Sequence, residues 1–311
     1  MRSEGGVTGA RPLTRRDLFP RALIDGREAR DHFFDRLRRR TSSVLVSRAD
    51  REEADVERRL RSLAGVTRPN LVTVASPKGG VGKTTTSFLA GNILASHLKL
   101  RAIVVDANPG NGTLGRLPAD CDRAESSLAD LLDNADRLNT AAELRRYVAR
   151  LPSGLHLLAA PHDPDLTATL GPDRYGELVA LLSCFYETIV LDLRTGMTGP
   201  LARLAIERAD QAVLVTTPDQ LTATLAIHAL GDLDSDRTTV VVNRSHQRLA
   251  PELTAIEDCL VRRGLRRPVA LPDDRRLATM LDTGAYSLEA LDRRTRLSVK
   301  RLGLAVGDRL V

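Results

Sequence analysis

The stretch VASPKGGVGKTTTS, residues 74–87, is the feature that most restricts the fold of this chain. The overlapping run LVTVAS, residues 71–76, is apolar enough for a buried strand, and the residues from Lys83 onward suit a helix. The three glycines between them let backbone N–H groups turn inward around an anion, and the N-terminus of the helix adds further N–H groups. The stretch therefore predicts a strand, an anion-binding loop and a helix in immediate succession.

The spacing of this loop departs from the general phosphate-loop pattern, G-x-x-x-x-G-K-[ST], because Pro77 stands at the first position. The form K-G-G-x-G-K-[ST] fits instead, from Lys78 to Thr84. In such a loop we expect Lys83 to contact the β- and γ-phosphates of a nucleotide and the Thr84 hydroxyl to bind Mg²⁺. The residues expected to hold the nucleotide here are Gly79, Gly80, Val81, Gly82, Lys83, Thr84 and Thr85.

Short apolar runs alternate with helical patterns along the rest of the chain. Most of the runs are continuously apolar, which is typical of parallel strands covered on both faces. The alternation predicts an α/β fold, a doubly wound, mostly parallel sheet flanked by helices, with ligands at the carboxyl ends of the strands. The expected strands are 71–76, 101–107, 155–160, 188–193, 211–217, 238–244 and 268–271. The expected helices are 83–97, 126–133, 139–150, 173–184, 199–208, 219–232, 251–263, 274–282 and 287–301.

Charge is distributed unevenly over the 311 residues. Residues 1–68 contain 17 arginines and 11 acidic residues, which accounts for the whole net charge of +6. We interpret this segment as a basic N-terminal extension, partly disordered, with a helix at 27–40 and a second at 47–65. Residues 69–311 are electrically balanced and form the predicted α/β domain.

Two classes of protein are disfavoured by composition. No apolar run is long enough to span a bilayer and the N-terminus lacks the apolar segment of a signal peptide, so we expect a cytoplasmic protein. Cys121, Cys184 and Cys259 are widely separated and form no metal-binding or disulfide pattern, so we expect buried free thiols.

The loop resembles the deviant Walker A motif of the ParA/MinD family of P-loop ATPases, and the resemblance extends over roughly residues 71–291. In that family the additional lysine, here Lys78, reaches across a dimer interface to the phosphates of the nucleotide bound by the partner subunit. Lysine is rare in this chain, with four among 46 basic residues, which supports a specific role for Lys78. The resemblance implies ATP and Mg²⁺ as ligands and an ATP-dependent homodimer.

Two later segments match positions where the family has acidic residues. In VVDANPGNGTLG, residues 104–115, Asp106 matches the first switch aspartate, whereas Asn108 stands where better-studied members have an aspartate that positions the attacking water. An amide cannot accept a proton as a carboxylate can, so either another group takes over or hydrolysis is slow. In TIVLDLRTG, residues 188–196, Asp192 matches the family's Mg²⁺ ligand, acting through water. The implied Mg²⁺ residues are Thr84, Asp106 and Asp192, and the implied catalytic residues are Lys78, Lys83, Asp106 and Asp192.

Two further matches concern the purine. Asn243, at the end of the run VVVNRS, matches the family's adenine-reading asparagine and offers both a donor and an acceptor. Pro272, in ALPDD, matches a loop that packs on the base. By resemblance these residues complete a nucleotide site.

The family resemblance implies an ATPase switch that converts ATP and water to ADP and phosphate, slowly without an activating partner protein, and that positions or partitions DNA or another cellular cargo. The alternative is a MinD-like accessory ATPase of a secretion system, as in the branch associated with type VII secretion, with weak or no hydrolysis. A purely structural role stays open because of Asn108. Iron–sulfur carriers and the nitrogenase reductase, which share this loop, are disfavoured because no cysteine pair is present to hold a cluster.

Three outputs remain open at this stage. Nonspecific DNA binding, at the nucleoid, would use basic side chains; membrane binding, which is less favoured, would use the tail LSVKRLGLAVGDRLV; and protein docking would use apolar residues of the N-terminal arm. The candidate DNA contacts are Arg262, Arg263, Arg266 and Arg267, with Arg36, Arg38, Arg39 and Arg40 in the arm. The candidate docking residues are Phe33, Phe34 and Leu37.

Overall fold

The computed structural model describes most of the predicted α/β domain and one helix before it. The expected helix at 27–40 and Cys121 lie outside the described residues. So do the candidate contacts of the arm, Arg36, Arg38, Arg39, Arg40, Phe33, Phe34 and Leu37. The described residues are 42–63, 65–108, 114, 128–160, 171–246 and 249–310.

Within the described part of the chain, eight strands form one sheet in the order β3-β4-β2-β5-β1-β6-β7-β8. The pairs are parallel except β3 with β4, so the prediction of a mostly parallel sheet is confirmed. Because β1 lies between β5 and β6, the loop that follows β1 is placed at the middle of the carboxyl edge. The strands are β1 Asn70–Ala75, β2 Ala102–Ala107, β3 Ala149–Arg150, β4 His156–Leu158, β5 Thr188–Leu193, β6 Gln211–Thr216, β7 Thr238–Ser245 and β8 Val269–Pro272.

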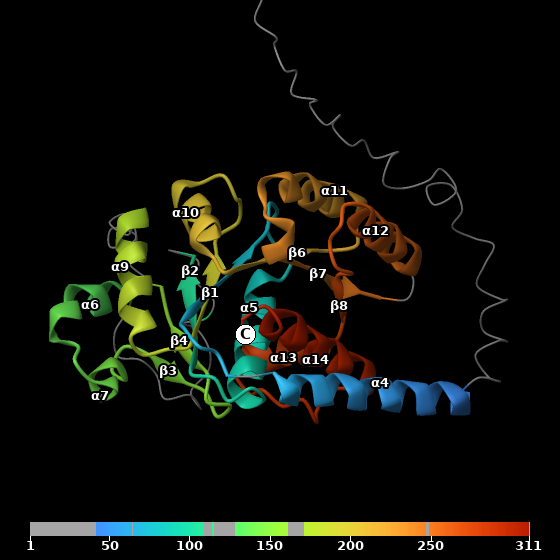
Figure 1. The fold of residues 1–311 in the computed structure, drawn as a ribbon, viewed down its shortest axis with the longest axis horizontal. Coiled ribbons are helices and arrows are strands. Elements are labelled where there is room, and N and C mark those ends of the chain that lie inside the picture. The colour runs from blue at the N-terminus through green and yellow to red at the C-terminus, as the bar shows by residue number, and fades with distance from the viewer. Residues whose placement is uncertain are drawn as a thin grey trace, which may run out of the picture.

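Helices cover both faces of the sheet, as Figure 1 shows with α10, α11 and α12 above it and α4, α13 and α14 below it. Alternate residues of β1 explain this, because Val72 and Val74 join the core under α5 and α14 whereas Leu71 and Ala75 join the core under α9 and α10. None of the described helices combines the length and apolarity needed to cross a membrane. The helices are α4 Ser42–Ser62, α5 Lys83–Ser96, α6 Leu128–Asp133, α7 Ala141–Leu144, α9 Pro172–Ser183, α10 Pro200–Arg208, α11 Gln220–Ala229, α12 Ala250–Arg262, α13 Arg275–Thr283 and α14 Arg293–Gly307.

Three expectations were wrong. The predicted helix 139–150 ends after the single turn of α7, and its last two residues form β3 against β4. The predicted helix 287–301 begins only at Arg293, where the Asp292 side chain accepts a hydrogen bond from the Thr295 N–H and caps α14. Cys184 is exposed at the end of α9, whereas Cys259 is buried as expected.

The helix α4 packs directly on the α/β domain. Its apolar side chains Val56 and Leu60 are buried in the same core cluster as Leu302 and Val306 of α14. Helix α4 therefore shares a hydrophobic core with the α/β domain. The predicted domain boundary at residue 68 stays a prediction.

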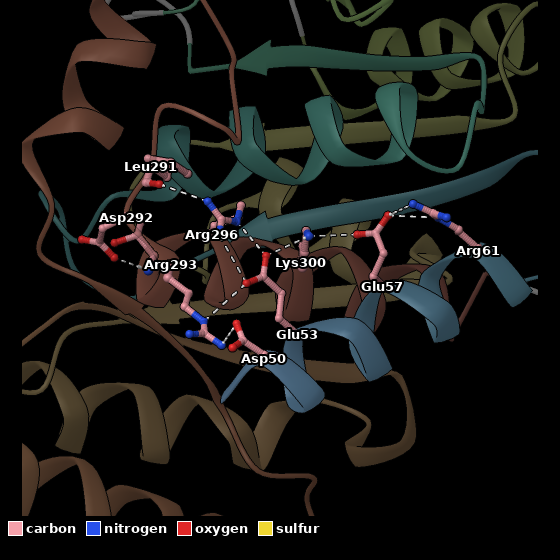
Figure 2. A network of polar contacts seen from close by, with 10 residues as sticks. Asp50, Glu53, Glu57, Arg61, Leu291, Asp292, Arg293, Arg296 and Lys300 are labelled. Atoms are coloured by element: carbon pink, nitrogen blue, oxygen red, sulfur yellow. Dashed lines mark hydrogen bonds and ion pairs between the residues drawn. The ribbon is translucent and has the colours of Figure 1, made fainter. Parts of the chain in front are cut away.

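A network of ion pairs joins α4 to α14 beside that core (Figure 2). Glu53 lies 2.6 Å from Arg296 Nε and 3.0 Å from Lys300 Nζ, and Lys300 also lies 3.0 Å from Glu57. The hydrogen bond from Arg296, helped by Lys300, outweighs burial and lowers the pKa of Glu53 to about 2. Ionised Glu53 therefore stabilises the contact between the two helices.

We expect Glu53→Gln to lower the free energy of unfolding at pH 7 by about 1–3 kcal/mol, because Arg296 and Lys300 lose a shared carboxylate. The folded pKa lies below the unfolded value, so this stabilisation is complete above about pH 4.5 and is lost as the pH falls towards 2. Urea denaturation at several pH values measures the difference. Glu52→Gln is the matched control: Glu52 pairs with Arg301 on an exposed face, and its loss should change stability by less than about 0.5 kcal/mol. Equal losses of stability in the two variants would contradict the assignment of the stabilising ion pairs to Glu53.

Candidate functional site

The loop between β1 and α5 has the shape expected of an anion cradle. Gly80 and Gly82 adopt positive φ values of 75° and 94°, and Gly82 is the N-cap residue of α5. A Cβ added to Gly82 would lie 2.0 Å from Asn243 Nδ2, so space as well as backbone conformation requires glycine there. Glycine has no side chain to cap the helix, so the first turn of α5 presents free N–H groups at the carboxyl edge of the sheet.

Lys83, the first residue of α5, points into this edge. Its side chain is nearly buried, and Nζ lies 3.3 Å from Thr195 Oγ1 in the segment after β5. Burial lowers the pKa of Lys83, and the nearby charge of Asp192 opposes that shift. A desolvated ammonium group at a helix N-terminus is well suited to bind a phosphate group.

Two buried carboxylates lie side by side below the loop. Asp106 on β2 and Asp192 on β5 are register partners in the sheet. Asp192 accepts hydrogen bonds from Thr84 Oγ1 at 2.6 Å and from Ser87 Oγ at 3.2 Å. Burial raises the pKa of Asp192 to about 7, with a further increase from Asp106 and opposition from the two hydroxyls and Lys83.

Asp106 is held by backbone groups instead. It accepts from the N–H groups of Asn108 at 3.0 Å and Leu114 at 3.3 Å. Burial raises its pKa to about 6 in spite of these bonds. Asn108 and Leu114 are thus both held by this carboxylate.

Lys78 and Lys83 contact different parts of the fold. Its Nζ donates to Thr222 Oγ1 at 3.2 Å, on the first turn of α11, and Thr222 in turn donates to Asp219, the N-cap residue of that helix. Lys78 is partly exposed. The two lysines of the loop therefore face different elements, one the phosphate cradle and the other the start of α11.

The residues matched to the purine lie at the ends of β7 and β8. Asn243 is buried and its Nδ2 donates to Val81 O at 2.8 Å, so one of its N–H groups is engaged with the phosphate loop. Pro272 ends β8 opposite Ser245 and is not among the described residues that line the cavity below.

A cavity of about 510 Å³ opens over the cradle, within the size range of small-molecule sites. Sequence reasoning missed several of its residues, because they lie in segments without a phosphate-loop pattern. Asn108 and Thr84, which were predicted, also line it. The described residues that line it are Gly80, Gly82, Lys83, Thr84, Asn108, Leu193, Thr195, Arg244, Leu281 and Asp282.

Of the missed residues, Thr195 could have been found by its place three residues after Asp192. Arg244 carries a positive φ of 54° directly after Asn243, a conformation that sequence alone does not reveal. Ser87 was missed as a partner of Asp192, although it stands one helical turn after Thr84. Asp282 on α13 comes from a distant part of the chain.

The arrangement fits a nucleotide phosphate chain with Mg²⁺. The glycine cradle and Lys83 supply donors for phosphate oxygens, while the Thr84 hydroxyl and the Asp192 carboxylate are the hard oxygen ligands that Mg²⁺ prefers. The described residues contain no cluster of three metal-binding side chains. That is compatible with Mg²⁺, which is commonly held by one or two carboxylates together with substrate phosphates and waters.

Fold and site together define a nucleotide-binding α/β protein of the phosphate-loop class. Residues 72–284 match the CobQ/CobB/MinD/ParA nucleotide binding domain, and the chain belongs to this family. The chain is 28% identical over 237 residues to the septum site-determining protein MinD of Synechocystis, covering 75% of this chain and 85% of that protein. It is 27% identical over 253 residues to the ESX-1 secretion-associated protein EspI of Mycobacterium tuberculosis, of which the match covers only 36%.

Solved structures show the same fold. A ParA family ATPase from Chlorobium tepidum superimposes with a TM-score of 0.61 at 20% identity, over 75% of this chain and 98% of that one. MinD from Pyrococcus horikoshii, crystallised with Mg-ADP, gives a TM-score of 0.58 at 20% identity, over 75% and 94%. The expected family and the expected fold class are both confirmed.

We expect Asp192→Asn to raise the free energy of unfolding at pH 8 without nucleotide, on the order of 1–4 kcal/mol. The folded pKa is about 7 and the ordinary value 3.8, so the folded state bears the cost of ionisation above pH 7 and escapes it as the pH falls below about 4. Urea denaturation at pH 8 and pH 4 compares the two proteins. Asp282→Asn, at an exposed carboxylate of the same cavity, is the control and should be neutral within about 0.5 kcal/mol. A loss of stability in Asp192→Asn at pH 8 would contradict the expectation.

Proposed function

We propose that this protein is an ATP- and Mg²⁺-binding, ATP-dependent dimerising switch that hydrolyses ATP slowly without a partner. The observation that carries the proposal is the contact of Thr84 with Asp192 beneath a glycine cradle that also holds Lys83. Family membership supports nucleotide binding. The relatives with Mg-ADP or partner proteins in their structures support the choice of ligands and of a protein-regulated cycle.

Each residue has a distinct part in this proposal. Lys83 and the loop N–H groups bind the β- and γ-phosphates, and Thr84 and Asp192 hold Mg²⁺, which when bound neutralises developing phosphate charge. Asp192 would bind the cation in its ionised form, so Mg²⁺ has to compete with a proton at this carboxylate below about pH 7. Asp106 accepts hydrogen bonds from the Asn108 and Leu114 N–H groups and so positions Asn108, which lines the cavity.

Asn108 bears on the hydrolysis step. It lines the cavity, where an amide can orient a water molecule but cannot accept its proton. Among the described lining residues, Asp282 is the carboxylate, and it comes from α13. Slow turnover with a stable ATP-bound state follows from this composition, and an activating protein would supply or reorient the missing group.

The burial and contacts of the candidate surfaces favour DNA binding over membrane binding as the output of the switch. The C-terminal helix α14 has its apolar residues in the core, with Val299, Leu302 and Val306 fully buried, which disfavours its use as a membrane anchor. In the predicted DNA patch, Arg263 donates to Ile227 O and Arg266 pairs with Asp308. Arg262 and Arg267 are exposed and support, with the arm, nonspecific DNA binding.

A second candidate is an accessory role in protein secretion. The similarity to EspI, a secretion-associated protein, favours it. Salt-sensitive, ATP-dependent retention on DNA would favour the first output, whereas its absence, together with ATP-dependent capture of a secretion-apparatus component, would favour the second.

Lys83→Ala should reduce ATP affinity at least about 100-fold, because the buried ammonium group provides a charge-assisted contact with phosphate. Calorimetric titration with Mg·ATP measures the loss. Lys99→Asn is the control, since Lys99 is exposed after α5 with a φ of 57°, a conformation that asparagine tolerates. Unchanged ATP affinity in Lys83→Ala would remove the basis of the proposed site.

Lys78→Ala should keep ATP affinity within about threefold and abolish the ATP-dependent dimer, because Nζ faces α11 rather than the cradle of its own chain. Light scattering with a non-hydrolysable ATP analogue distinguishes monomer from dimer. Persistence of the ATP-dependent dimer in this variant would contradict the proposed cross-subunit role of Lys78.

A further inference from the structure

Asn243 lies between two parts of the site that are far apart in sequence. It stands near the end of β7, is 6% exposed, and its side chain reaches Val81 O in the phosphate loop at 2.8 Å. A carbonyl oxygen can only accept, so the atom that faces Val81 must be the amide nitrogen. This contact therefore fixes the orientation of the Asn243 amide.

The residues around this contact are closely packed. Val81 is itself buried in the core, with 2% of its surface exposed. Gly82 follows at positive φ, and the place of its missing Cβ is filled by Asn243 Nδ2. Lys83 comes next and is the first residue of α5. The amide thus holds the loop at the residue before the N-cap, two positions before the phosphate-binding lysine.

We propose that Asn243 is a positioning residue for the phosphates, which sets the conformation of the loop 79–84 through its hydrogen bond to Val81 O. The inference deepens the proposed function and rests on it, because it concerns the same nucleotide site. Asn243 retains a second N–H and the Oδ1 atom, so this role is compatible with contact to a base. One side chain then links the strand beside the base to the cradle that binds the phosphates.

The test separates the two roles of Asn243 with a ligand that has no base. Inorganic tripolyphosphate with Mg²⁺ and Mg·ATP are titrated calorimetrically into the wild-type chain, Asn243→Ala and Asn243→Leu. Neither variant can donate to Val81 O, and leucine retains most of the volume, so agreement between them excludes a pure cavity effect. We expect tripolyphosphate affinity to fall about tenfold in both, the effect of one buried hydrogen bond of about 1.4 kcal/mol.

A second measurement needs no ligand at all. Hydrogen–deuterium exchange of the Thr86 amide, which donates to Gly82 O at 2.9 Å and so reports on the end of the loop, should accelerate about fivefold or more in both Asn243 variants. The matched control is Asn92→Ala, because Asn92 is also fully buried and its Nδ2 donates to Phe88 O at 2.7 Å, within α5 and away from the cradle. That variant should lose stability without changing exchange of the Thr86 amide or tripolyphosphate affinity.

Tripolyphosphate affinity within twofold of wild type in the Asn243 variants would overturn the inference, and a fall in ATP affinity alone would assign Asn243 to the base only. Unchanged exchange of the Thr86 amide would overturn it equally. If wild-type protein binds neither ATP nor tripolyphosphate, the proposed function fails, whereas faster exchange of the Thr86 amide in the variants would still establish the positioning contact.

Discussion

The burial of two neighbouring carboxylates is the constraint on which the rest of this structure depends. Asp106 and Asp192 are register partners at the carboxyl edge of a sheet covered on both faces, and burial raises the pKa of each. Such a pair is costly unless donors surround it. The Thr84 and Ser87 hydroxyls and the Asn108 and Leu114 N–H groups supply those donors, so the carboxylates fix the start of α5 and hold Asn108 and Leu114.

The strands were the most predictable part of the fold. The run 188–193 is β5 without change, because a strand buried on both faces must be continuously apolar and polar residues mark its ends. The same reasoning failed where tertiary contacts decided. Two residues of β3 are too few to leave a pattern, and the start of α14 depended on the Asp292 cap rather than on apolar spacing, which is similar on both sides of it.

The site was predictable where its residues are contiguous and unpredictable where they meet only in space. Lys83 and Thr84 follow from one loop, since glycine spacing and the helix start dictate their directions. Thr195, Arg244 and Asp282 come from three separate segments and carry no spacing that links them. The bond from Asn243 to Val81 likewise depends on β7 and the loop lying at one edge, a relation that only the sheet order β1-β6-β7 supplies.

The different surroundings of the two lysines bear on how a cycle could work. Lys83 is nearly buried beside Asp192 and lies at the cradle of its own chain. Lys78 is partly exposed, its ammonium group contacts the Thr222 hydroxyl at 3.2 Å, and its charge interacts with the Asp219 carboxylate. A triphosphate carries more negative charge than one carboxylate and binds an ammonium group more strongly than a hydroxyl does. In the proposed dimer, a triphosphate presented by a second copy of the chain would therefore compete with α11 for Lys78, and loss of the terminal phosphate would weaken that attraction. The contacts of Thr222 and Asp219 at the start of α11 would then differ between the ATP-bound and ADP-bound states.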